Sequence, residues 1–134
     1  MHDDQALAHE LLRSARTIAV VGISSDPTRP SYDVARYLIA AGYTVYLVNP
    51  TEHEVLGQPV YARLQDLPER VDIVDVFRRP EFVPEVVADA IEAGAGAVWT
   101  QLDIVHEAAA ATARAAGLAV VMDRCTKIEH SRLR

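Results

Sequence analysis

The sequence predicts an α/β fold, in which a mostly parallel five-stranded sheet lies between two layers of helices. Five short apolar runs alternate with segments whose apolar residues have helical spacing, the pattern of successive βαβ units. The runs are apolar on both faces, as buried parallel strands are, and turn-forming or polar residues follow them. We therefore expect a Rossmann-like three-layer α/β/α sandwich. The strands are expected at Thr17–Ile23, Thr44–Val48, Asp72–Phe77, Ala97–Thr100 and Ala119–Met122.

Helices are expected between these strands, with one more before the first strand. Ser31 is expected to be the N-cap of the second helix, and Gly42 follows its end. Residues 51–71 are less regular, with one helical turn expected at Leu64–Leu67, and Asp123–Arg134 is expected to be a polar tail. The helices are predicted at Asp4–Ala15, Tyr32–Ala41, Glu81–Ala93 and Ile104–Ala116.

The order of the strands follows from right-handed crossovers between parallel neighbours. We predict one domain over residues 1–134, with strand order 3-2-1-4-5. The two aspartates of the Asp72–Phe77 strand suggest partial exposure or an outer position. In this order the topological switch point lies between the first and fourth strands, so Gly22–Ser24 and Trp99–Gln101 are expected to line the crevice.

Composition limits the setting of the protein and its partners. The 134 residues carry a formal net charge of -6, which argues against non-specific nucleic-acid binding, since that needs a broad basic face. Cys125 is the one cysteine, as expected in a reducing cytoplasm. We see no signal peptide and no apolar run near the roughly 20 residues of a membrane span, so we expect a cytoplasmic protein without a membrane partner.

The candidate binding residues share one property, because each group lies where an apolar run ends. The carboxyl ends of parallel strands meet at one edge of the sheet, where ligands of such folds bind. Five separate stretches of sequence therefore indicate one binding site. They are Arg29, Asn49, Arg78-Arg79, Thr100-Gln101 and Asp123-Arg124-Cys125.

The loop after the first strand has features of a phosphate site. Gly22 has no Cβ, so a ligand could approach the backbone closely. The helix start at Ser31 offers unpaired N–H groups and a positive dipole end, and Arg29 adds charged donors. The pattern is not GxGxxG, because the next glycine is Gly42, and a stiff turn with an exposed arginine would explain the same residues.

The end of the second strand discriminates between cofactors. NAD-binding domains usually place an acidic residue there to hold the ribose hydroxyls, whereas this chain has Asn49-Pro50. Glu52 is nearby, but we expect it to point away. The neutral Asn49 facing Arg78 and Arg79 favours a nucleotide with an extra ribose phosphate, such as NADP or coenzyme A. The arginines could instead pair with Glu81 and Glu85 on the surface.

Two further residues leave alternatives open. Trp99, at the end of the fourth strand, suits a core position better than a cofactor wall. Cys125 is flanked by Arg124 and Lys127, and neighbouring cations favour the reactive thiolate form. A half-buried structural cysteine would fit the same pattern. The histidines are scattered and show no HExxH or CxxC metal spacing.

With these residues in hand, the chain resembles the small single-domain CoA-binding protein family. This family is similar to the N-terminal domain of the succinyl-CoA synthetase α subunit. The most specific segments are RPSYxVARYL, VNP, DVFRRP and MDRCxKIEH. The matching stretches cover residues 20–38, 45–61, 71–87, 97–102 and 120–130.

The resemblance implies that coenzyme A binds along the carboxyl ends of the strands. The implied phosphate-facing residues are Gly22, Ile23, Ser24, Arg29, Ser31 and Tyr32. The implied adenine and ribose side comprises Asn49, Pro50, Val76, Arg78 and Arg79. The pantetheine arm is implied to run toward Trp99, Gln101 and Cys125.

We therefore expect a non-catalytic module that binds CoA or acyl-CoA. The alternatives are an NADP- or acyl-CoA-dependent enzyme or redox protein that uses Cys125, and an interaction subunit of a separate CoA ligase. Succinyl-CoA synthetase needs a second domain with a phosphorylated histidine, so we expect no ligase activity from this chain alone. A homodimer or a partner enzyme is compatible with the sequence, although no helix stripe requires one.

Overall fold

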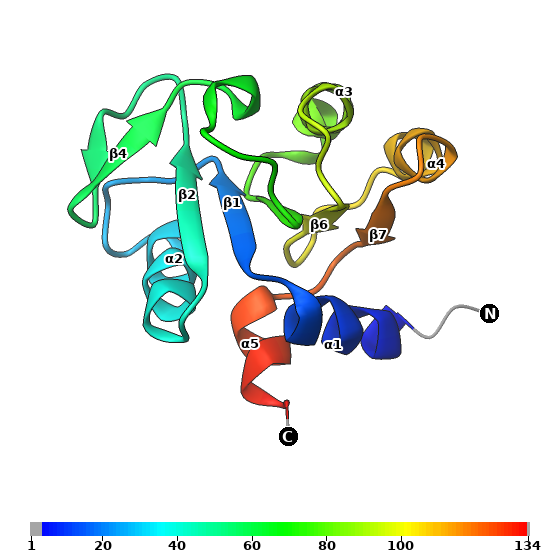
Figure 1. Cartoon of the computed structure of the whole chain (residues 1–134), viewed down its shortest axis with the longest axis horizontal. Helices are drawn as coiled ribbons and strands as arrows, with labels where there is room; N and C mark the ends of the chain where they lie inside the picture. The colour runs from blue at the N-terminus through cyan, green and yellow to red at the C-terminus, as the bar shows by residue number, and fades with distance from the viewer. Residues whose placement is uncertain (1–3, 134) are drawn as a thin grey trace.

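The computed structural model describes residues 4–133 as a seven-stranded sheet with helices on both faces (Figure 1). Three-layer α/β architecture of the Rossmann type is thereby confirmed. The elements are α1 (Asp4–Ser14), β1 (Thr17–Val21), α2 (Pro30–Ala40), β2 (Thr44–Val48), β3 (Glu54–Val55), β4 (Gln58–Tyr61), the 3-10 turn η1 (Leu64–Asp66), β5 (Ile73–Val76), the 3-10 turn η2 (Pro80–Phe82), α3 (Val83–Glu92), β6 (Ala97–Thr100), α4 (Glu107–Ala115), β7 (Ala119–Val121) and α5 (Thr126–Ser131).

The strand order is β3-β4-β2-β1-β5-β6-β7, and every neighbouring pair except β3–β4 is parallel. The predicted order was wrong, because the Asp72–Phe77 strand is β5 and pairs with β1. The place beside β2, which the prediction gave to the Asp72–Phe77 strand, is held by β4, with Val60 opposite Leu47. With β4 counted as the third strand, the parallel strands follow the 3-2-1-4-5-6 order of a Rossmann fold.

The corrected order moves the switch point of the sheet. It lies between β1 and β5, which are direct neighbours, and not between β1 and β6. The segment after β5, Phe77–Arg79, therefore faces Gly22–Ser24 across the crevice. All four residues of β5 are buried, so the prediction of an outer position for this strand was also wrong.

Each face of the sheet is covered by its own apolar cluster. Side chains alternate along β1, so Ala19 and Val21 pack in the cluster beneath α3 and α4. Ile18 and Val20 pack in the opposite cluster, beneath α1 and α2. Figure 1 shows α3 and α4 on one side of the sheet and α1, α2 and α5 on the other. No helix between residues 4 and 133 is both long and apolar enough to cross a membrane.

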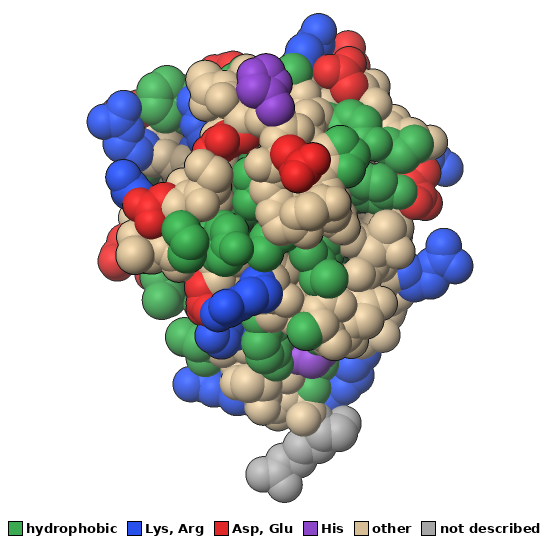
Figure 2. Space-filling view, turned by 90° about the vertical axis from the view of Figure 1, so that its left-hand side faces the viewer, with side chains coloured by type: hydrophobic (Ala, Val, Ile, Leu, Met, Phe, Trp, Pro, Cys, Tyr) green, Lys and Arg blue, Asp and Glu red, His purple; other side chains and the backbone are tan. Residues whose placement is uncertain are grey.

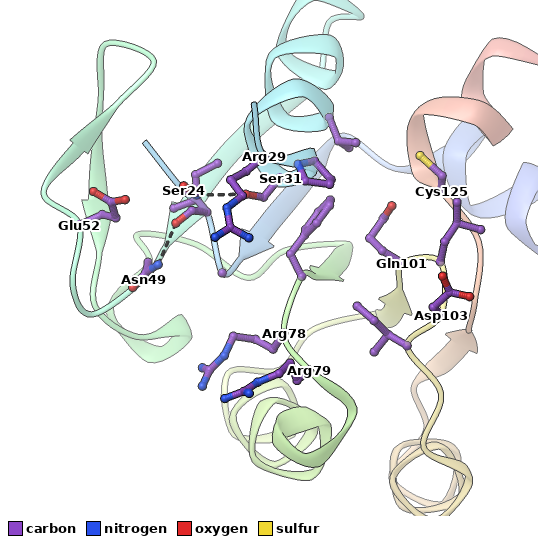
Figure 3. A pocket seen from close by; sticks show the side chains of 17 residues that line it. Ser24, Arg29, Ser31, Asn49, Glu52, Arg78, Arg79, Gln101, Asp103 and Cys125 are labelled. Atoms are coloured by element: carbon purple, nitrogen blue, oxygen red, sulfur yellow. Dashed lines mark hydrogen bonds between the residues drawn. The ribbon is translucent and has the colours of Figure 1, made fainter. Parts of the chain in front are cut away.

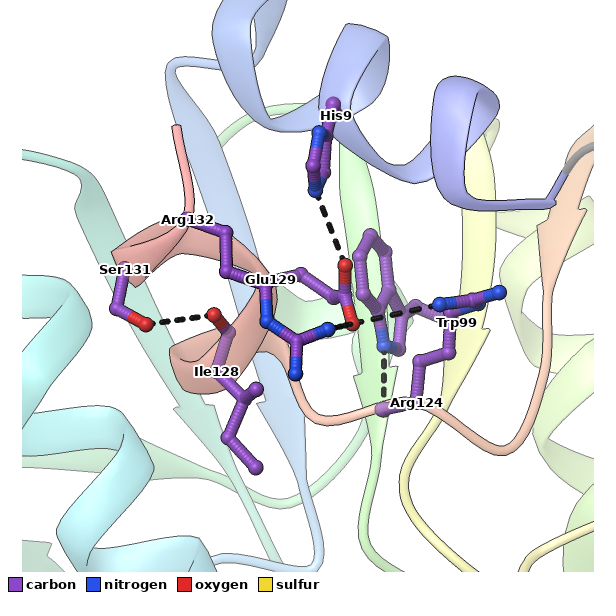
Figure 4. A network of polar contacts seen from close by, with 7 residues as sticks. All are labelled: His9, Trp99, Arg124, Ile128, Glu129, Ser131 and Arg132. Carbon is purple, nitrogen blue, oxygen red and sulfur yellow. Dashed lines mark hydrogen bonds and ion pairs between the residues drawn. The ribbon is translucent and has the colours of Figure 1, made fainter. Parts of the chain in front are cut away.

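The expected polar tail contains a helix, α5, that packs against α1 and α2. Glu129 of α5 is 3% exposed, and its carboxylate accepts hydrogen bonds from three side chains (Figure 4). The donors are His9 Nε2 at 3.0 Å, Arg124 at 3.4 Å and Arg132 at 3.3 Å. This network fixes the segment that carries Cys125. His9 lies 120 residues from Glu129 in the chain, so local sequence patterns give no sign of this contact.

Surface charge is mixed on the face drawn in Figure 2. Lys and Arg side chains are interspersed there with Asp and Glu, and apolar side chains lie between them. This face therefore offers no continuous basic surface.

Candidate functional site

A cavity of about 650 Å³ opens at the carboxyl ends of β1, β5 and β6, and at the start of α2 (Figure 3). Its volume is within the range typical of small-molecule sites. Ten of the fourteen predicted site residues line it. They are Gly22, Ile23, Ser24, Arg29, Ser31, Asn49, Arg78, Arg79, Gln101 and Cys125.

Gly22 directly follows β1 and has a φ of +94°, a conformation that favours glycine. A Cβ at this position would lie 2.6 Å from the Phe77 carbonyl oxygen. The missing side chain thus lets the ends of β1 and β5 approach each other. Gly22 also lines the cavity, so its expected role in making room for a ligand stays a prediction beside this packing role.

The start of α2 differs from the prediction. The helix begins at Pro30 with Arg29 at the N-cap position, so Ser31 is not the cap. Ser31 is buried instead, and its Oγ accepts a hydrogen bond from the Ser24 N–H at 3.1 Å. This contact ties the first loop to the helix start, whose positive dipole end lies at the cavity and favours an anion there.

Three arginines from two loops line this one cavity, as expected from the sequence. The Arg78 and Arg79 guanidiniums lie over the Phe82 ring, with Cζ 4.5 and 5.4 Å from its centroid. Arg79 Nε is 4.0 Å from the exposed Glu81 carboxylate, which makes a weak surface pair. The guanidiniums are thus positioned by an aromatic ring and keep donors for a ligand.

Glu52 lines the cavity, contrary to the expectation that it points away. Its Oε2 accepts a hydrogen bond from the Ser25 N–H at 2.8 Å. The turn is set by Asn49, whose Oδ1 accepts from the Thr51 N–H and hydroxyl while its Nδ2 donates to the Ile23 carbonyl oxygen. A carboxylate therefore stands near the end of β2 after all, which removes one argument against NAD.

Four predicted residues lie outside this cavity. Val76 and Trp99 are fully buried in the core, and Trp99 Nε1 donates to the Arg124 carbonyl oxygen at 2.8 Å. Trp99 is therefore a core residue that also fixes the last loop. Tyr32 packs against the cluster beneath α1 and α2. Pro50 lines a second cavity of about 640 Å³, which shares Gly22, Asn49 and Arg78 with the first.

Cys125 lines the cavity at the side opposite Glu52 (Figure 3). Both cations beside Cys125 have carboxylate partners, and the choice between a reactive and a structural cysteine stays a prediction. Arg124 binds Glu129, and Lys127 Nζ lies 2.7 Å from Asp33 Oδ2. The thiol therefore lies in the cavity without a free cation supplied by its sequence neighbours.

Sequence reasoning missed a buried polar cluster behind the cavity, formed by Asp75, Gln101 and Thr126. Burial raises the pKa of Asp75 to about 7, although hydrogen bonds from Thr126 and Gln101 oppose this shift. Thr126 Oγ1 donates to Asp75 Oδ2 at 2.8 Å, and Gln101 Nε2 donates to Asp75 Oδ1. An aspartate within an apolar strand was the available signal, but we interpreted it as exposure.

The chain belongs to the CoA binding domain family, whose model matches residues 16–131. It is 38% identical over 122 residues to the uncharacterized protein YneT of Bacillus subtilis, covering 91% of this chain and 90% of YneT. The solved structure of a hypothetical protein from Pyrococcus horikoshii has a TM-score of 0.94 and 38% identity, covering 99% of this chain and 96% of that one.

A larger relative contains a similar region. The α subunit of the ADP-forming acetate–CoA ligase II of Pyrococcus furiosus is 35% identical over 80 residues. The match covers 59% of this chain but 18% of the ligase subunit. Membership of the CoA binding domain family confirms the resemblance drawn from the sequence, and the similarity to the ligase extends over a small part of that subunit.

Proposed function

We propose that this protein binds coenzyme A or an acyl-CoA at the carboxyl ends of β1 and β5, as a non-catalytic binding module. One observation carries the proposal: Arg29, Arg78 and Arg79 come from two separate loops and line one cavity. Guanidinium groups bind phosphate oxygens through paired, charge-assisted hydrogen bonds. A cluster of this kind beside a helix start suits a ligand with several phosphates.

The two cavities suggest how the ligand lies. They meet at Gly22, Asn49 and Arg78, so one elongated molecule could occupy both. The phosphates would lie at the arginines and the nucleoside toward Pro50, in the second cavity. The pantetheine arm would run along the first cavity toward Gln101 and Cys125.

Calorimetric titration with CoA, dephospho-CoA, NADP and NAD tests the proposal. We expect CoA to bind most tightly, and dephospho-CoA to bind roughly 10- to 100-fold more weakly, since it lacks the 3′-phosphate. Equal affinity for CoA and dephospho-CoA would remove the arginines' role in recognising this phosphate. Tighter binding of NAD would instead assign Glu52 to ribose hydroxyls and refute the proposal.

A second candidate function rests on Cys125, because its thiol lies in the same cavity. Its thiolate could attack a sulfur of CoA disulfide, forming a protein–CoA mixed disulfide and releasing one CoA thiolate. Intact-protein mass spectrometry after incubation with CoA disulfide tests this reaction, with Cys125→Ser as the control. An unmodified wild-type protein would rule it out.

A further inference from the structure

The amide of Gln101 is held by hydrogen bonds on one side only. Gln101 is 6% exposed, yet it lines the cavity. Its Nε2 donates to Asp75 Oδ1 and, at 3.2 Å, to Thr126 Oγ1. None of the residues between 4 and 133 donates a hydrogen bond to its Oε1, and this oxygen is not among the fully buried side-chain atoms that lack a partner. Figure 3 shows this oxygen directed toward the side of the cavity where Cys125 lies.

The orientation of this amide follows from the hydrogen-bonding capacity of its two partners. Thr126 uses its hydroxyl hydrogen in donating to Asp75 Oδ2, so toward Gln101 it offers a lone pair. In the ionised carboxylate, the form of Asp75 above its pKa of about 7, Oδ1 also offers only lone pairs. Both neighbours therefore require the NH₂ group of Gln101, and a turned amide would place its oxygen against two other oxygens. The closed triangle of bonds fixes the carbonyl oxygen toward the cavity.

We propose that Asp75 and Thr126 are positioning residues that hold Gln101 Oε1 as an acceptor for an amide N–H of the ligand's arm. This inference rests on the proposed function and deepens it, because the pantetheine arm of CoA carries two amide groups. Gln101 lies on the side of the cavity toward Cys125, away from the arginines (Figure 3). Its acceptor thus selects for the arm, whereas the arginines select for phosphates.

The most direct test changes the ligand and leaves the protein intact. Two CoA analogues are compared with CoA by calorimetry at pH 8, each with one amide N–H of the arm replaced by an ester oxygen. For the wild-type protein we expect at least one analogue to bind about two- to tenfold more weakly than CoA, which is the effect of losing one neutral hydrogen bond. Adenosine 3′,5′-bisphosphate, which lacks the arm, serves as a reference.

Protein variants then separate positioning from structural support. In Gln101→Met and Asp75→Leu, the preference for CoA over the ester analogue should fall to about one. The first variant lacks the acceptor, and the second removes the oxygen that holds the NH₂ group of Gln101. Thr126→Ser keeps the hydroxyl and should retain the preference, whereas Thr126→Val should lose it. Affinity for adenosine 3′,5′-bisphosphate should stay within about twofold throughout, a result that general damage to the fold would not give.

The outcomes are distinguishable. If wild-type protein binds CoA and both ester analogues equally, Gln101 accepts no amide hydrogen and the inference is overturned, while the proposed function stands. An unchanged preference in Asp75→Leu would likewise overturn the positioning role. If the wild-type protein binds no CoA at all, the proposed function fails and this inference fails with it.

Discussion

Replacement of Asp75 by Asn should change how the stability of this protein depends on pH. Burial raises the pKa of this carboxyl from 3.8 to about 7 in the folded protein. Between these values the folded state holds a proton that the unfolded chain has released. The free energy of unfolding therefore falls as the pH rises from about 4 to about 7, and the Asp75 contribution is constant above that range.

The size of this effect follows from the shift. A difference of about three pH units corresponds to about 4 kcal/mol, an upper value because real interiors relax around a buried charge. The introduced asparagine would not titrate, so the stability of Asp75→Asn relative to wild type should rise by up to that amount between pH 4 and pH 8. Asn can replace the carboxyl without a buried unpaired group, because its own oxygen can accept from Gln101 Nε2 while its NH₂ group donates to Thr126 Oγ1.

Urea unfolding followed by circular dichroism, at pH 4 to 8, measures this difference. Asp72→Asn is a matched control: burial would raise the pKa of Asp72, but hydrogen bonds from the Arg16 and Thr17 N–H groups lower it overall. Its contribution changes only as the pH falls below about 4, so the difference between this variant and wild type should be flat from pH 5 to 8. A flat difference for Asp75→Asn as well would refute the assignment of a destabilising buried charge.

Three other predictions concern binding and packing. In calorimetry, Arg78→Ala and Arg79→Ala should each weaken CoA binding by about 1–3 kcal/mol without lowering the Tm of the protein. The control is Arg114→Ala, on the exposed face of α4, which should leave the affinity for CoA unchanged. Glu129→Ala should lower the free energy of unfolding, measured in urea, by about 2–3 kcal/mol, because it leaves Arg124 and His9 without their buried partner. If Glu129→Ala loses no more stability than Glu129→Gln, this reasoning is contradicted. Gly117→Ala should lower the free energy of unfolding by approximately 1–2 kcal/mol, because Gly117 has a positive φ but open space around a new Cβ. Gly22 has a similar φ, but its new Cβ would meet the Phe77 carbonyl oxygen, so Gly22→Ala should cost more. Equal losses would mean that the Phe77 contact has no cost.

The layers of the fold could be predicted because the central strands are continuous apolar runs. The strand order could not, because β4 has the sequence QPVY, in which Pro59 argues against a strand. Pro59 is tolerated here because β4 has just its last two residues, Val60 and Tyr61, paired with β2. Without β4, β5 was placed at the edge of the sheet and the crevice one strand away from its actual position.

The site could be predicted where it depends on strand ends, since these gather at one edge whatever the order of the strands. That is why the three arginines were found. The positions of Glu52 and Asp75 depend on partners distant in sequence: the Ser25 N–H lies 27 residues from Glu52, and Thr126 lies 51 residues from Asp75. A polar residue in an apolar run indicates exposure unless such partners are known, and one sequence does not reveal them.

A crystal structure of the protein with CoA tests the central claim most directly. We predict phosphate oxygens within hydrogen-bond distance, about 3 Å, of the guanidiniums of Arg29, Arg78 and Arg79, in the cavity at the ends of β1 and β5. CoA bound on another face, or in this cavity with its phosphates turned away from all three arginines, would contradict the account.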